Sequence, residues 1–407
     1  MSSPAKIRHV LLRLFAVAGV VVIPVVCFKY LVPPYFWIGC GYLIVALVLS
    51  FFVTSTRSKV VLVYLITIIV TLTGFEWYLY SSRSYKEGRI ENVYDGKYTI
   101  EHPDLGYTLS ASLVRPNATK YLDDELIYQV SYSTNEHGLR SSMGGDRVDG
   151  YYGCILVYGG SFAYGEGLND EETLPWQIDV QTGRRHRVFN FGLHGYGPHH
   201  MLASLESGHT ASIVGCDDEP VVVIYQAISD HLRRALGLTS WDEHGPRYLV
   251  DDQGKAVHAG YFDETVTRGR LFHLLDESYI FRAVLGSNRP RREEDYDLLQ
   301  AVVEQARAKS NELFDLQDFV VIYWDDGPQD PLPEKLGNSG LRVFRVHNII
   351  PGSRASDSEY RLVGDSHPSP LANKKIAGFV VEQGVVPQRK TNSGQQQSSY
   401  GDGDKGQ

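Results

Sequence analysis

Two segments of the chain carry residues whose types and spacing could support nucleophilic catalysis. Ser161 follows Gly159 and Gly160 directly after a short apolar run, and paired glycines let the backbone turn sharply and expose a hydroxyl. One residue separates Asp365 from His367, so the carboxylate could accept the imidazole N–H and hold one tautomer. Taken alone, the first motif also fits a phosphate-binding or plain turn, and the second fits a surface loop.

A third segment, 190–197, is rich in glycine and could present backbone N–H groups to a ligand. It contains Gly192, Gly195 and Gly197. An oxyanion hole needs such donors where negative charge develops on a tetrahedral intermediate, although an ordinary strand-to-helix turn uses glycine as well. Other polar residues near these motifs are expected to serve mainly as scaffold: Tyr164, Glu166, His194, His199 and His200.

The motifs follow strands in a regular alternation of strands and helices. Apolar runs typical of buried strands lie at Cys154–Tyr158, Val188–Phe191, Val221–Tyr225, Phe319–Tyr323 and Val343–Val346. Helices are expected near 171–182, 198–206, 295–314 and 372–383. This alternation predicts an α/β fold with a doubly wound parallel sheet. Because sites in such folds form at the carboxyl ends of the strands, the three motifs should meet at one sheet edge.

The order of the three motifs resembles the SGNH (GDSL-like) hydrolase superfamily, over about 151–383. The resemblance implies a flavodoxin-like sheet and no cofactor. It also implies that Ser161 is the nucleophile, that His367 is the general base and that Asp365 is the acid of the triad. Many members of the superfamily place two residues between the acid and the base. The single residue here is a spacing seen in relatives that act on polysaccharide acetyl groups.

The resemblance further implies an oxyanion hole built from the backbone N–H groups of Ser161 and Gly195. The superfamily's third donor is an asparagine side chain after the third strand. In this chain Ser229 takes that place, and its hydroxyl is the expected third donor, from a shorter side chain. Cys154 and Cys216 precede the first and third strands, which are neighbours in this fold, so they are expected to form a disulfide.

Three apolar runs, at 10–28, 35–53 and 60–80, precede this domain. Each has about 20 residues, the length that a helix needs to cross a bilayer. We therefore expect residues 1–81 to form a membrane anchor of three transmembrane helices, with a buried helical hairpin as the alternative. Basic residues such as Arg8 and Arg57 favour a cytoplasmic N-terminus, which places the remainder outside, with the bacterial inner membrane as the expected location.

Composition excludes several functions. The 407 residues include 39 basic and 48 acidic ones, for a net charge of −9. The acidic excess lies after the anchor and repels phosphate backbones, so nucleic-acid binding is not expected. Four cysteines without a C-x-x-C pair argue against a zinc site, and no other metal site is expected. The remaining segments are a lead-in of strands and loops at 82–150, a hairpin-bearing insertion at 239–293 and a disordered tail at 387–407.

These observations favour a membrane-anchored serine esterase that removes O-acyl groups, most plausibly acetyl, from an extracytoplasmic carbohydrate or a similar ester. An O-acyltransferase with the same triad is the first alternative. A catalytically inactive binding or assembly protein on the same scaffold is the second, motivated by the missing asparagine. The sequence does not determine the oligomeric state.

Overall fold

The computed structural model describes most of the chain after the first two apolar runs. The described residues are 55–87, 90–142, 151–216, 219–239, 241–264, 278–284, 291–325, 327 and 329–387, with Gly41, Ile44 and Val45. They fall into two units. Two of the three predicted membrane helices and the predicted disordered tail therefore lie largely or wholly outside the described residues.

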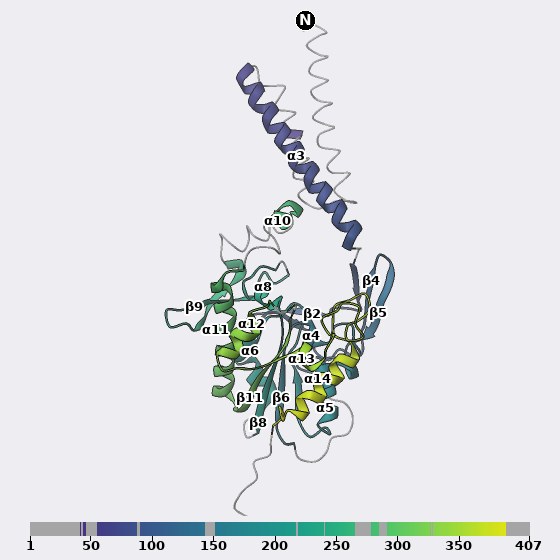
Figure 1. Ribbon diagram of the computed structural model, residues 1–407, viewed down its shortest axis with the longest axis vertical. Helices are drawn as coiled ribbons and strands as arrows, with labels where there is room; N and C mark the ends of the chain where they lie inside the picture. Colours follow the sequence, from purple (N-terminus) through teal and green to yellow (C-terminus); the bar gives the residue numbers. More distant parts are fainter. Residues whose placement is uncertain are drawn as a thin grey trace, which may run out of the picture. The chain divides into compact units, whose positions relative to one another are not determined.

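The smaller unit contains the helices α3 (Thr56–Glu87) and α10 (Tyr279–Val284) (Figure 1). Within the described residues, one helical stretch, Val63–Ser82 in α3, is long and apolar enough to cross a membrane. It matches the third predicted run. Most of its apolar side chains are exposed. The one acid of residues 1–81, Glu76, is buried and accepts hydrogen bonds from the backbone N–H groups of Tyr279 (2.6 Å) and Ile280 (2.9 Å).

The larger unit is built on a five-stranded parallel sheet with the order β12-β11-β8-β6-β7. The strands are β6 (Cys154–Gly159), β7 (Arg187–Asn190), β8 (Pro220–Ile228), β11 (Asp315–Trp324) and β12 (Arg342–Arg345). All five coincide with the predicted apolar runs. The predicted α/β fold with a parallel sheet is confirmed.

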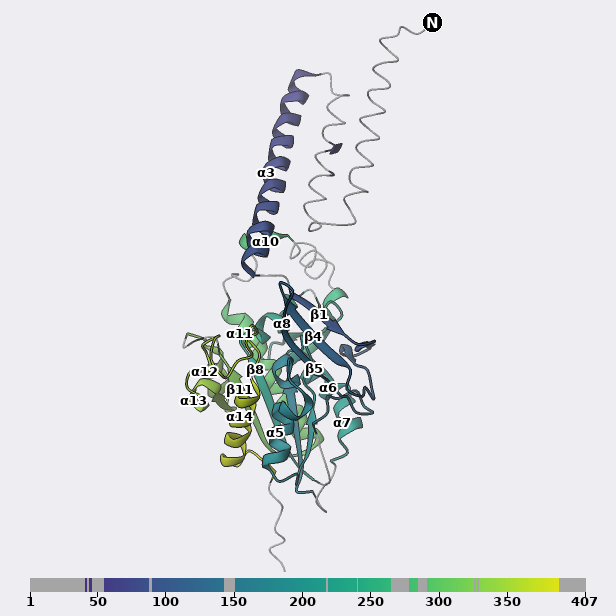
Figure 2. The same cartoon turned by 90° about the vertical axis from the view of Figure 1, so that its right-hand side faces the viewer.

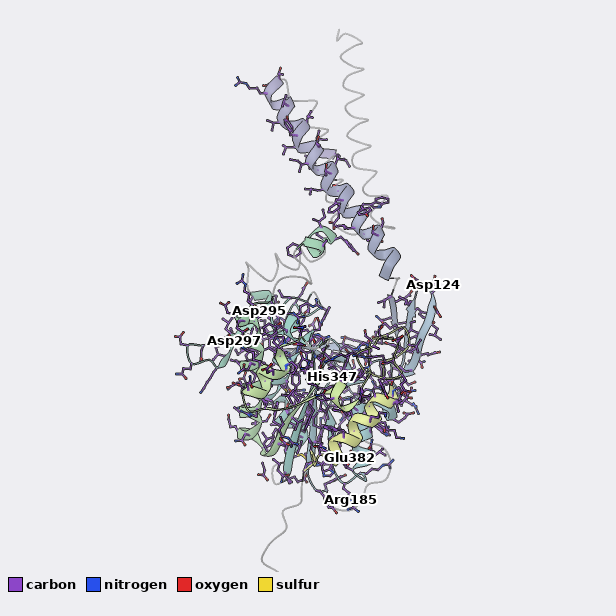
Figure 3. All side chains as sticks on the ribbon, in the orientation of Figure 1. Asp124, Arg185, Asp295, Asp297, His347 and Glu382 are labelled. Carbon is purple, nitrogen blue, oxygen red and sulfur yellow. A yellow bond between two sulfur atoms is a disulfide. The ribbon has the colours of Figure 1, made fainter. Side chains whose placement is uncertain are left out.

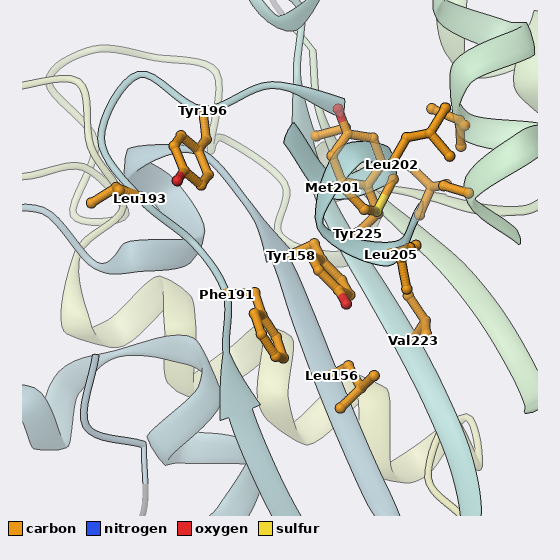
Figure 4. Close-up of a cluster of buried hydrophobic side chains, with 14 of the residues drawn as sticks. Leu156, Tyr158, Phe191, Leu193, Tyr196, Met201, Leu202, Leu205, Val223 and Tyr225 are labelled. Carbon is orange, nitrogen blue, oxygen red and sulfur yellow. The ribbon is translucent and has the colours of Figure 1, made fainter. Parts of the chain in front are cut away.

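Helices cover both faces of this sheet (Figures 1 and 2). One face packs against α6 (Pro198–Glu206), α7 (His209–Val214), α8 (His231–Ala235), α11 (Glu293–Leu313) and α12 (Leu332–Asn338). The other packs against α5 (Leu174–Gln181), α13 (Val346–Ile349) and α14 (Pro370–Glu382). Successive residues of each strand enter opposite cores because side chains alternate along a strand. Leu156 and Tyr158 of β6, for example, meet Val223 and Met201 in the first core (Figure 4).

The lead-in residues form small antiparallel sheets that pack onto the same core. The strands are β1 (Ile90–Tyr94), β2 (Thr99–His102), β3 (Gly106–Leu109), β4 (Asn117–Leu122) and β5 (Glu125–Ser131). Their pairing is β1-β4-β5 and β2-β3. Tyr98 and Leu109 belong to the same buried cluster as β6 and β8. The lead-in from Glu91 onward is thus part of the larger unit.

The predicted insertion, 239–293, is divided between the two units. Its hairpin, β9 (Pro246–Val250) and β10 (Ala256–Tyr261), belongs to the larger unit and turns at Asp251–Gly254. Its α10 helix packs against α3 in the smaller unit.

A side-chain cap and a disulfide stabilise parts of the larger unit. Asp295, in the first turn of α11, accepts the backbone N–H of Arg292 at 2.9 Å and so caps that helix (Figure 3). Cys154 and Cys216 form a disulfide with a Cα–Cα distance of 6.6 Å, which confirms that prediction.

Candidate active site

The structure brings Ser161, His367 and Asp365 together although 206 positions separate the serine from the histidine. Ser161 follows β6 directly, and the loop that holds the other two precedes α14. The Ser161 hydroxyl donates to Nε2 of His367 at 2.8 Å. Nδ1 of His367 lies 2.5 Å from Oδ1 of Asp365. Because an ionised carboxylate only accepts, Nδ1 carries the proton and Nε2 is left to accept from the serine.

A lysine of the lead-in holds the second oxygen of Asp365. Lys120 on β4 donates to Oδ2 at 2.7 Å, across 245 positions of sequence. Burial alone would raise the pKa of Asp365, but the hydrogen bonds from His367 and Lys120 outweigh it and lower the pKa to about 2. Asp365 is therefore ionised at neutral pH. Lys120 could not be predicted, because no motif marks a residue that reaches the site from a separate small sheet.

A second carboxylate lies beside the catalytic imidazole. Oε2 of Glu166 is 3.4 Å from Nε2 of His367 and 2.7 Å from Nδ1 of His194. Burial would raise the pKa of Glu166, but His194 and His367 hold it well below its usual range. Both Glu166 and His194 line the pocket described below, so they are more than the scaffold that the sequence suggested.

Close contacts explain the glycines around the nucleophile. A Cβ on Gly160 would lie 2.5 Å from Nη1 of Arg234 and 2.9 Å from the carbonyl oxygen of Tyr196. Gly195 has φ +79°, and a Cβ there would lie 2.5 Å from Nε1 of Trp241. Only glycine fits both positions without displacement.

The two expected backbone donors follow neighbouring strands of the sheet. Ser161 is the first residue of the short helix α4 (Ser161–Tyr164), and Gly195 lies on the loop after β7. Within the part of the chain that the structure describes, neither N–H donates to another backbone group. Both residues line the same pocket. These N–H groups are therefore available to a bound oxyanion.

The third expected donor, Ser229, follows β8 but directs its hydroxyl elsewhere. Ser229 donates to Oδ2 of Asp330 at 2.7 Å, and the same oxygen accepts the hydroxyl of Tyr323 at 2.7 Å. Ile228, not Ser229, lines the pocket. In this arrangement the hydroxyl proton of Ser229 is engaged by Asp330, and a role in the oxyanion hole stays a prediction.

A buried arginine from the lead-in supports the loop after the nucleophile. Arg140 is 1 % exposed. Its guanidinium donates to Asp170 at 3.0 Å and to the carbonyl oxygens of Tyr164, Gly165 and Leu168. These bonds satisfy a buried charge and hold the segment that carries Glu166.

The triad opens into a pocket of about 970 Å³ within the larger unit. This volume accommodates a ligand larger than a simple acetate ester. Ser161 and His367 line it together with Glu166, His194 and Gly195 from the loops beside them. Lead-in and insertion residues complete the lining: Asn92, Tyr94, Thr99, Tyr107, Trp241, Glu243 and His244.

A second histidine–carboxylate cluster lies in the protein interior. His199 and His200 on α6 have Nε2 atoms 2.9 and 3.3 Å from the carboxylate of Asp242. Their spacing could in principle hold a metal ion. However, Nδ1 of His200 accepts the backbone N–H of Gly197 at 3.2 Å. Nε2 of His200 therefore carries the proton and cannot ligate a metal in this arrangement, so these residues do not fit a metal.

The chain matches solved structures of lipolytic proteins and carbohydrate esterases. One is a member of the lipolytic protein G-D-S-L family from Veillonella parvula, with 10 % identity over 56 % of this chain and 96 % of that chain and a TM-score of 0.33. Another is an acetyl xylan esterase from the rumen bacterium Butyrivibrio proteoclasticus, with 10 % identity and a TM-score of 0.32. The match covers 72 % of this chain and 97 % of that chain. A third is a carbohydrate acetylesterase family member from Sinorhizobium meliloti, with 10 % identity and a TM-score of 0.30. The match covers 57 % of this chain and 98 % of that chain.

No family model and no curated protein matches the chain. The other matched structures include a further lipolytic protein of the G-D-S-L family and an SGNH-hydrolase family esterase. With TM-scores near 0.3, the chemistry rests on the side chains described above.

Proposed function

We propose that this protein is an SGNH-type serine esterase that removes O-acyl groups, most plausibly acetyl, from a carbohydrate or a similar ester. One observation carries the proposal: the hydrogen-bonded chain from Ser161 through His367 to Asp365, with distances of 2.8 and 2.5 Å, at the mouth of a pocket. A serine hydroxyl needs an adjacent oriented base to become a nucleophile at neutral pH, and this arrangement supplies one.

The mechanism follows from the geometry. Ser161 Oγ attacks the ester carbonyl while His367 Nε2 takes its proton, and Asp365 stabilises the imidazolium that forms. The N–H groups of Ser161 and Gly195 hold the oxyanion. His367 then gives the proton to the departing alcohol, which leaves an acyl-serine. Water attacks that ester, transfers its proton to His367 and releases the carboxylic acid, after which His367 returns the proton to Ser161.

Acyl transfer to a sugar hydroxyl is the second candidate reaction. It needs the same acyl-serine and differs only in the acceptor. The observation that favours it is the size of the pocket, about 970 Å³, which leaves room for an acceptor larger than water. Turnover with and without an added oligosaccharide acceptor, with detection of acylated product, separates the two reactions.

The proposed location is the outer side of a bacterial inner membrane, with residues 1–81 as a multi-pass anchor. The apolar stretch Val63–Ser82 supports at least one spanning helix. The disulfide between Cys154 and Cys216 supports an oxidising compartment, because cytosolic thiols are kept reduced. Reaction of the intact cell with a membrane-impermeant protease, followed by detection of the larger unit, tests this placement.

Hydrolysis of p-nitrophenyl acetate by the purified full chain tests the function. The wild-type protein should release p-nitrophenol, and Ser161→Ala should abolish the release while the protein stays folded. The Ser207→Ala variant, which alters an exposed serine at the end of α6, serves as the matched control and should keep full activity. Equal turnover by Ser161→Ala and the wild type would favour the inactive-scaffold alternative.

A further inference from the structure

A tryptophan from the insertion stands beside the proposed oxyanion loop. Trp241 lines the pocket and keeps 48 % of its surface exposed. Its indole Nε1 donates to the carbonyl oxygen of Gly195 at 3.4 Å. Because the N–H of Gly195 faces the reacting carbonyl in the proposed mechanism, the indole adjoins the part of the substrate next to the ester. A large exposed aromatic face in a pocket is suited to covering a ring of the ligand.

Two arginines and a buried aspartate adjoin the indole. The guanidinium groups of Arg233 and Arg234 lie 5.3 and 5.9 Å from the ring centre. The next residue, Asp242, is 1 % exposed and accepts a hydrogen bond from His199. A ring that is already fixed loses little conformational freedom when a ligand covers it, so it binds with a smaller entropic cost.

The pocket lining combines apolar side chains with exposed polar ones, which suits a ligand that carries both hydroxyl groups and an apolar ring face. Exposed residues with hydrogen-bonding side chains share the lining with the indole: Asn92, Thr99, Glu243, His244 and Ser366. Donors and acceptors of this kind can replace the water that hydrates a sugar.

The charges in the pocket favour a neutral ligand. Glu243 is an exposed carboxylate of the pocket lining, and Glu166, which bonds to His194, is a second carboxylate near the triad. Arg234 also lines the pocket, but its Nε donates to Asp230 at 3.0 Å and its Nη1 to the carbonyl of Tyr196 at 2.7 Å. A sugar acid would therefore meet carboxylates and a cation whose charge is already paired.

We propose that Trp241 is a stacking platform for a neutral sugar ring adjacent to the scissile ester, so that the substrate is an O-acetylated neutral oligosaccharide or polysaccharide. This inference rests on the proposed esterase function. It adds a binding residue and a ligand class: the pyranose ring covers the indole, its hydroxyls meet the polar lining, and its acetyl ester reaches Ser161.

Steady-state kinetics of the full-length protein with two esters test the proposal. One substrate is an acetylated cello-oligosaccharide, and the other is ethyl acetate, which has no ring to stack. In Trp241→Ala the ratio of kcat/KM for the oligosaccharide to kcat/KM for ethyl acetate should fall about tenfold, mainly through KM, because the covered apolar area is lost. Trp241→Phe keeps an aromatic face and should restore most of the ratio.

A matched control variant is Leu249→Ala on β9, because Leu249 is 49 % exposed in the same insertion but does not line the pocket. It should leave the ratio unchanged. An unchanged ratio in Trp241→Ala, or equal losses on both esters, would overturn the proposal, since the indole would then be scaffold only. Preference for an acetylated uronic-acid oligomer would also overturn it. Failure of the wild-type protein on both esters would instead overturn the esterase function itself.

Discussion

Two histidine–carboxylate clusters in the larger unit use the same chemical groups for different purposes. In the first, His367 lies between Asp365 and the Ser161 hydroxyl and lines the pocket. In the second, the side chains of His199 and Asp242 are fully buried, and among the described residues no nucleophile is bonded to that imidazole. The comparison teaches that an ordered imidazole becomes a catalytic base only where a nucleophile and a substrate can reach its second nitrogen. A sealed pair can only hold the chain together.

The largest expected effect is the loss of activity when the imidazole of the first cluster is removed. His367→Ala should lower kcat for p-nitrophenyl acetate by about 10⁶-fold, because the serine loses its base. The thermal unfolding midpoint should change little, because His367 is only partly buried. If His199→Ala lowered kcat as much while remaining folded, the distinction between the clusters would be wrong.

Removal of the carboxylate from the second, buried cluster should instead lower the stability of the protein. Asp242→Ala removes the hydrogen-bond acceptor of the buried His199 and the carboxylate that lies 3.3 Å from Nε2 of the buried His200, so it should destabilise the protein by about 3 kcal/mol or more. Urea unfolding followed by circular dichroism measures this loss. Activity of the molecules that remain folded should fall far less than in His367→Ala, and a stability equal to that of the wild type would contradict the structural role.

Acid should destabilise the protein through the buried cluster. Burial and the neighbouring His200 lower the pKa of His199 to about 4, so the folded protein binds fewer protons there than the unfolded chain. Stability from this group is complete above pH 6.5 and is lost as the pH falls from 6.5 towards 4, at about 1.4 kcal/mol per pH unit. Unfolding midpoints measured between pH 7 and 4.5 should decline less steeply in His199→Asn than in the wild type.

Removal of the Lys120 amine, which holds Asp365, should lower activity by a smaller factor. Lys120→Met removes the donor to Oδ2 of Asp365, so the carboxylate is held less firmly and kcat should fall about tenfold. Lys120→Arg keeps a cation and should recover part of the loss. Lys97→Met, on the exposed lead-in surface, is the control. A Lys120→Met enzyme with wild-type kcat would remove Lys120 from the set of positioning residues.

Short-range patterns made much of this site predictable. The glycines before Ser161, the Asp-x-His spacing of Asp365 and His367 and the apolar runs of the five strands are local, so they locate the triad and the sheet edge. Lys120 and Arg140 could not be found in this way, because each reaches the site from the lead-in, and their partners depend on tertiary packing. The disulfide was predictable only because the fold made its two strands neighbours.

Ser229 shows a different limit. Its position after β8 is correct, but the direction of a hydroxyl depends on its acceptor. That acceptor is Asp330, 101 positions away, and nothing in the sequence pairs the two. Glu166 and His194 likewise lie near the motifs, but only the fold places both in the pocket.

Covalent labelling of the purified chain with a fluorophosphonate probe tests most directly whether Ser161 is an activated nucleophile. The hydrogen bond between Ser161 and His367 predicts that mass spectrometry will find the phosphonate on Ser161, and that His367→Ala will abolish the labelling. Absence of a label on Ser161 in the folded wild-type protein, or a label on another serine that persists in Ser161→Ala, would contradict the proposed esterase mechanism.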